Sequence, residues 1–180
     1  TRGARLVGAA LKNYRSFAPG DSGPVQLIPD SSRFLDYQVV FGSDTVKLSS
    51  WTFEPSVDRL NVAPGGSRLT WTTERGGVVV TLTYRFSASD YLFHVQGDLS
   101  AAGAQGALVL VGLGPELRMV ESDSVDDRRS YALVTKARST EKLDFNSLTT
   151  GQRRELAGPF DWVALKTKYF VAAVLTVDSA

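Results

Sequence analysis

Residues 77–87 read GVVVTLTYRFS, and this stretch decides the fold class. Apolar or aromatic side chains occupy every second position, and residues 79, 81, 83, 85 and 87 between them are mostly hydroxylated or charged. A period of two that is rich in β-branched and aromatic residues is typical of a half-buried antiparallel strand. We therefore predict a strand whose core-facing side chains are Val78, Val80, Leu82, Tyr84 and Phe86.

The flanking segments predict a three-stranded meander around residues 77–87. Residues 67–73 alternate in the same way, and Glu74-Arg75-Gly76-Gly77 supplies glycine where a tight hairpin needs positive φ. On the other side, the polar residues 88–90 precede a second alternating run at 91–99. Residues 77–87 should therefore pair antiparallel with both neighbours.

The rest of the chain also predicts strands. The segment 158–169 and the run 169–177 form two adjoining strand candidates, and the second is apolar on both faces, as expected inside a two-layer core. A single weak helical turn is predicted at 149–156. The remaining strand candidates are 25–28, 33–41, 47–53, 107–113, 129–137 and 143–148. Many short strands without a helical stripe predict an all-β antiparallel β-sandwich with few or no helices, built as one domain over 1–180.

Composition excludes several classes of function. A net charge of +1 leaves no electrostatic footprint for nucleic acid, and the apolar runs 107–112 and 170–175 are far shorter than a membrane helix. The absence of cysteine excludes disulfides and thiolate chemistry. No start methionine or signal peptide is present, so we expect Thr1 and Ala180 to be processing edges rather than natural termini.

Two polar clusters could carry chemistry. His94, Gln96 and Asp98 share one face of a predicted strand and could act as acid and base, but a solvent-facing row is favoured because no nucleophile motif accompanies them. The carboxylates at Glu116 and 121–127 could suggest calcium, yet they lack the ligand order of an EF-hand. A solvated loop balanced by the following arginines is favoured there. No catalytic residue, metal site or cofactor is predicted.

The C-terminal motif and the order of the strands carry a family resemblance. Trp162-Val163-Ala164 followed by Tyr169-Phe170 resembles the periplasmic domain of the YidC/Oxa/Alb family of membrane protein insertases. The junction at 87–91 and the run Leu108–Pro115 are similar to other segments of that domain, so the likeness covers most of the chain from about Leu69 onward. From their strand positions, Trp162, Tyr169 and Phe170 are expected to be structural packing residues rather than a ligand site.

The resemblance implies a β-supersandwich like that of galactose mutarotase, placed at the periplasmic face of the bacterial inner membrane. It also implies contacts with SecDF and the Sec translocon, and nascent membrane proteins as clients of a membrane core that this chain lacks. Members of the family continue beyond the equivalent of 169–175, so the domain is expected to be truncated on its C-terminal side.

Two other interpretations remain open from the sequence. The first is a sugar-acting, aldose epimerase-like enzyme, which would need more than the one histidine present. The second is a passive binder of carbohydrate, peptide or lipid on the same fold.

Overall fold

The computed structural model describes residues 2–30, 32–100, 106–114 and 117–177. Antiparallel strands dominate, which confirms the predicted all-β antiparallel sandwich class. Within the described ranges there is one α-helix, α1 (Ser124–Arg129), and two single 3-10 turns, η1 (Leu48–Ser50) and η2 (Phe145–Ser147). None of the described helices has the length and apolar character needed to cross a membrane.

The chain divides into two compact units. The first unit comprises Thr1–Leu6 with Leu35–Gly112, and the second comprises Val7–Phe34 with Leu113–Ala180. Each unit therefore combines segments that are distant in sequence. The prediction of one domain over the whole chain stays a prediction.

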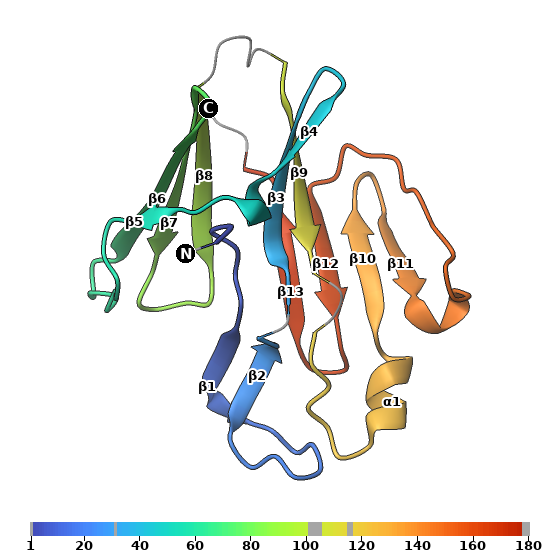
Figure 1. The fold of residues 1–180 in the computed structure, drawn as a ribbon. Coiled ribbons are helices and arrows are strands. Elements are labelled where there is room, and N and C mark those ends of the chain that lie inside the picture. The colour runs from blue at the N-terminus through green and yellow to red at the C-terminus, as the bar shows by residue number, and fades with distance from the viewer. Residues whose placement is uncertain (1, 31, 101–105, 115–116, 178–180) are drawn as a thin grey trace. The chain divides into compact units, whose positions relative to one another are not determined.

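The meander of the first unit is the clearest element of the fold (Figure 1). Its strands β5 (Glu54–Pro55), β6 (Ser67–Arg75), β7 (Val78–Phe86) and β8 (Phe93–Ser100) follow one another in a four-stranded sheet. β7 pairs antiparallel with both β6 and β8, as predicted. Val80, Leu82 and Tyr84 are buried, whereas Val78 and Phe86 at the ends of the strand are half-buried.

The turn between β6 and β7 consists of two residues. Arg75 pairs with Val78, so Gly76 and Gly77 alone connect the strands. Both glycines have positive φ, 59° and 76°, which suits the right-handed twist of a two-residue hairpin. The tight turn explains why β6 continues two residues beyond the predicted end.

The second sheet of the first unit has the order β4-β3-β9, formed by β3 (Phe34–Phe41), β4 (Asp44–Lys47) and β9 (Leu108–Leu113). The prediction of a strand at 47–53 is wrong. Pairing with β3 ends at Lys47, and η1 then turns the chain so that Leu48 and Phe53 are both buried, at 2% and 1% exposure. The chain forms a 3-10 turn here, instead of a continuous strand, because this conformation buries both Leu48 and Phe53.

The N-terminal segment belongs to the core of the first unit, which the sequence does not reveal. The Tyr84 hydroxyl donates to the carbonyl of Ala4 at 2.9 Å and lies 3.4 Å from the Tyr37 hydroxyl. Gly3 donates to the carbonyl of Trp51 at 2.9 Å. Burial raises the pKa of Tyr84, so this hydroxyl remains a neutral donor.

The second unit contains a four-stranded sheet of order β11-β10-β12-β13 and a separate hairpin (Figure 1). The sheet strands are β10 (Ala132–Lys136), β11 (Thr140–Asp144), β12 (Trp162–Lys166) and β13 (Val171–Leu175), and the hairpin joins β1 (Ala9–Arg15) to β2 (Pro24–Ile28). The predicted strands at 129–137 and 143–148 are shifted because α1 occupies Ser124–Arg129 and η2 follows β11. The predicted helical turn at 149–156 does not form a helix among the described residues.

The prediction that the run 169–177 is buried on both faces is wrong. Among the described residues, β13 is the last strand of its sheet and pairs with β12 alone. Val171 and Leu175 are 59% and 53% exposed, and Tyr169 in the preceding turn is 62% exposed. Apolar composition on both faces indicated cover on both sides, but the face that carries Val171, Ala173 and Leu175 is exposed and the other face is half-buried.

Candidate functional site

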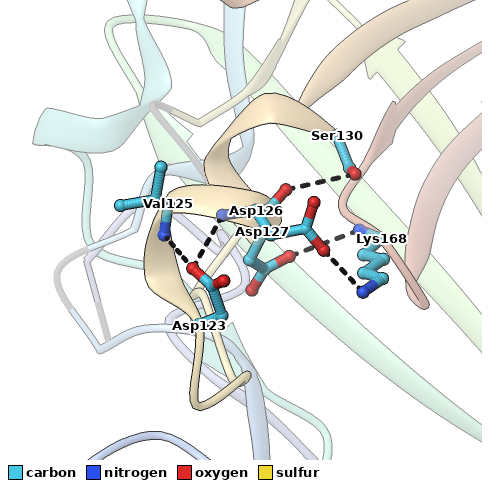
Figure 2. A network of polar contacts seen from close by, with 6 residues as sticks. All are labelled: Asp123, Val125, Asp126, Asp127, Ser130 and Lys168. Carbon is cyan, nitrogen blue, oxygen red and sulfur yellow. Dashed lines mark hydrogen bonds and ion pairs between the residues drawn. The ribbon is translucent and has the colours of Figure 1, made fainter.

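A buried carboxylate organises one end of the second unit. Asp127, in α1, is 1% exposed and uses both of its oxygens as acceptors. Its Oδ2 accepts from the backbone nitrogen of Val120 at 3.1 Å, and its Oδ1 accepts from the backbone nitrogen of Lys168 at 3.3 Å. Figure 2 shows the second of these bonds, which joins the helix to the turn between β12 and β13. Asp127 is thus a cross-link between segments about 40 residues apart.

The helix that carries Asp127 is specified by its own ends. Asp123 caps the N-terminus, and its Oδ1 accepts from Val125 and Asp126 at 3.0 Å each (Figure 2). Acidic residues occupy the first turn of the helix, and Arg128 and Arg129 occupy its last turn. This order of charges complements the helix dipole. The prediction of a solvated loop at 121–127 is therefore wrong for 124–127. The capping aspartate, followed by acidic and then basic residues, is the sequence signal that could have predicted this helix. Glu116, named with this cluster, lies outside the described residues.

A surface ion pair lies beside the buried carboxylate. Lys168 Nζ is 2.6 Å from Asp126 Oδ2, and both side chains are partly exposed. The hydrogen bond from Lys168 lowers the pKa of Asp126, and the same bond raises the pKa of Lys168. Lys168 Nζ also lies 5.2 Å from the centroid of the Tyr169 ring. The lysine is thus held by Asp126 and lies over the ring of Tyr169, which is itself 62% exposed.

The turn from Thr167 to Phe170 is closed by its own hydrogen bonds. Thr167, 2% exposed, donates its backbone N–H to the carbonyl of Phe170 at 2.8 Å and accepts from the Phe170 nitrogen at 3.2 Å. Phe170 then packs edge-on against Tyr14 of β1, with ring centroids 5.6 Å apart. The turn presents Tyr169 to solvent while Phe170 ties it to the hairpin.

The hairpin β1–β2 is held to the same end of the unit. Phe17 donates to the carbonyl of Val120 at 2.7 Å, and Arg118 lies 3.7 Å from Asp21. Asp21 also accepts from the backbone of Gly23 at 3.1 Å, a bond that lowers its pKa. Together with the Asp127 bonds, these contacts bring three separate segments of the chain into one polar and aromatic cluster.

The remaining motif residues lie along β12. Ala164 is 3% exposed, while Trp162 and Val163 are half-buried. Trp162 pairs with Leu175 on one side and Lys136 on the other. Trp162 is thus partly exposed, as its position beside lysines indicated. That Trp162, Val163, Ala164, Tyr169 and Phe170 have a purely structural role stays a prediction.

The polar row of β8 faces solvent. His94, Gln96 and Asp98 are exposed, and Gln96 accepts from Arg85 at 3.3 Å. This confirms the favoured solvent-facing interpretation of the row. Among the residues that the structure describes, no group of three or more His, Asp or Glu side chains is arranged to hold a metal.

Comparisons with known proteins concern the whole chain. The family model of the YidC periplasmic domain matches residues 1–180. A membrane protein insertase YidC from Prosthecochloris aestuarii is 27% identical over 97% of this chain, and one from Chloroherpeton thalassium is 26% identical over 99%. The chain spans 31% of the length of each of these relatives. No solved structure matches significantly. Since the family model covers every residue of it, this chain belongs to the YidC periplasmic domain family.

Proposed function

We propose that this chain is a non-catalytic periplasmic domain of a YidC-type insertase, which aids the insertion and folding of inner-membrane proteins. The observation that carries the proposal is the family match over residues 1–180, together with two relatives named as membrane protein insertases. The insertion step itself would belong to the membrane core of the longer protein. The domain would work at the periplasmic face of the inner membrane.

The polar cluster supports a structural rather than a catalytic role. Both oxygens of Asp127 accept backbone hydrogen bonds, and Asp126 is paired with Lys168. A general base must instead offer a lone pair to a substrate proton within hydrogen-bond reach. These carboxylates hold protein segments together, so the proposal includes no catalytic residue, metal or cofactor.

The partners in this proposal are SecDF and the Sec translocon, with nascent membrane proteins handled by the membrane core and no role for nucleic acid. Exposed apolar side chains support a role in protein contacts, because large exposed apolar residues mark interaction surfaces when they gather. The edge strand β9 carries four such residues in succession, Leu108, Val109, Leu110 and Val111, which are 64%, 56%, 49% and 42% exposed.

Co-purification from membranes tests the proposal. The full-length insertase is compared with a variant in which residues 1–180 are replaced by an unrelated periplasmic β-domain of similar size, as a matched control for bulk. We expect SecDF recovery to fall about tenfold or more in the replaced variant, which corresponds to a loss of about 1.4 kcal/mol in affinity. Equal recovery of SecDF from both proteins contradicts the proposed partner role.

A further inference from the structure

The edge strand β9 is uncharged and exposed on both of its faces. Leu108, Val109, Leu110 and Val111 are 64%, 56%, 49% and 42% exposed, and alternation along a strand places the two leucines on one face and the two valines on the other. β3 lies on one side of β9, and no described strand lies on its other side. The outer edge of β9 therefore offers backbone donors and acceptors to a further strand.

The other edge strands of the protein differ from β9. Proteins commonly guard the edges of sheets with charged residues or proline, which discourage pairing with another chain. Among the described strands that end a sheet, such residues occur in β1, β2, β4, β5, β8 and β11, and only β9 and β13 lack them. On β13 the exposed side chains share one face, whereas β9 is exposed on both. β9 is accordingly the described edge strand most open to pairing.

We propose that β9 pairs antiparallel with β9 of a second copy of this chain, about a two-fold axis at Leu110. In this register Leu110 lies opposite itself. The other pairs match a large side chain with a small one or a valine with a valine, and they are Ala107 with Leu113, Leu108 with Gly112, and Val109 with Val111. Gly112 leaves room for the leucine opposite it, so the strand is complementary to itself in size.

The absence of charge favours a second copy over a partner with a charged strand. Residues 101–115 contain no ionisable side chain. A charged residue of a partner strand would lose water beside the leucines and valines of β9 and gain no ion pair there. A second β9 brings no such charge, and a two-fold axis gives both copies the same contacts.

The symmetry of the pairing also limits its size. Each copy contributes its unguarded β9 edge, and the sheet of each copy then ends at β4, which carries Asp44 and Lys47. The assembly therefore closes as a dimer. Two paired strands of six residues bury less than the about 1,200–2,000 Å² of a standard interface, so the dimer should be weak, with a dissociation constant of about 10–100 µM.

Sedimentation of the 180-residue chain across this range of concentration tests the proposal, and we expect a shift from monomer to dimer. Leu110→Lys alone and Leu110→Glu alone should each raise the dissociation constant about tenfold or more, because like charges then lie opposite each other at the axis. An equimolar mixture of the two variants should restore the dimer. Ala173→Lys is the matched control, since it places the same charge on the other unguarded edge, and it should leave the dimer unchanged.

Cross-linking tests the register by a second route. The chain contains no cysteine, so a single introduced cysteine can form a disulfide only between copies. Leu110→Cys should cross-link on air oxidation, because directly opposite residues lie within the about 4.4–6.8 Å Cα separation of a disulfide. Leu108→Cys should not, because the two copies of residue 108 would be four residues apart along the strands, roughly 13 Å.

Several results would overturn the proposal: a parent that stays monomeric throughout, charged Leu110 variants that dimerise like the parent, a mixture that stays monomeric, or equal cross-linking of the two cysteine variants. Loss of the dimer in Ala173→Lys alone would place the interface on β13. If the charged variants have lowered denaturation midpoints, the cysteine pair decides. The inference does not rest on the proposed function, and these experiments contain no other protein, so their failure and failure of SecDF recovery are distinguishable.

Discussion

Replacing Asp127 with asparagine should destabilise the second unit, because both carboxylate oxygens are committed as acceptors. Either orientation of the asparagine amide keeps one acceptor and turns an NH2 group toward a backbone N–H. The N–H of Val120 or of Lys168 then loses its partner in a site where Asp127 is 1% exposed. An unsatisfied buried polar group costs about 1–3 kcal/mol, and the lost charge-assisted bond belongs to the stronger class.

We therefore expect Asp127→Asn to lower the free energy of unfolding by about 2–4 kcal/mol, a large part of a typical 5–15 kcal/mol. Asp127→Ala, which removes both acceptors, should cost at least as much. Urea denaturation gives the free energy, and amide hydrogen exchange at Val120 and Lys168 locates the loss of protection. Asp126→Asn, one residue away on the same helix, is the matched control, and its partly exposed ion pair should contribute little.

Equal denaturation midpoints for Asp127→Asn and Asp126→Asn would refute the reasoning. Such a result would mean that water or a local shift satisfies both backbone donors, and that Asp127 does not cross-link the helix to the β12–β13 turn. Loss of protection spread evenly over the chain, rather than concentrated at Val120 and Lys168, would equally contradict a local role.

Acid titration should reveal the contribution of the Asp126–Lys168 pair to stability. The hydrogen bond from Lys168 lowers the pKa of Asp126 in the folded state. The stabilisation from the pair is therefore present above the usual carboxyl pKa of about 4 and is lost as pH falls through the lower folded-state pKa. Asp126→Asn should flatten that part of the stability profile below pH 4, and an unchanged profile would contradict the pairing. Phe53→Ala removes a side chain that is 1% exposed and should lower the free energy of unfolding by about 3–5 kcal/mol. Phe170→Ala removes a half-buried side chain and should lower it clearly less. The reverse order in urea denaturation would show that Phe170 is a core residue. His94→Ala should change neither stability nor the interconversion of glucose anomers, and polarimetry that detects catalysis abolished by this substitution would restore the epimerase hypothesis.

Strand pairing in the meander was readable from the sequence because its causes are local. Alternation along Val78–Phe86 places one set of side chains on one face, and only antiparallel neighbours with the same period can cover it. Gly76 and Gly77 then fix the register, since a two-residue turn leaves no freedom to slip. Alternation also predicted the exposed His94 row, although Val95 on the opposite face of β8 is exposed too, at 36%.

Exposure of the C-terminal strand could not be read in this way. The sequence of β13 is apolar on both faces, and an inner strand and an uncovered edge strand have the same composition there. The matter is decided by which segments pack over each face of β13, and such long-range packing is encoded by no local pattern; strand order in the sheet is likewise set by long-range pairing.

The sequence by itself determined the fold class, the meander and its turn, the solvent-facing polar row and the family, because periodicity, turn chemistry and the succession of motifs can be read along the chain. Tertiary structure alone decided that Asp127 is buried while its neighbour Asp126 faces solvent, although both are aspartates on one short helix. It also joined Phe17 to Val120, and Asp127 to both Val120 and Lys168, through hydrogen bonds to the backbone. The reason is physical: burial and proximity depend on which distant segments pack together, and the Asp127 carboxylate can be buried because two such segments offer it backbone donors.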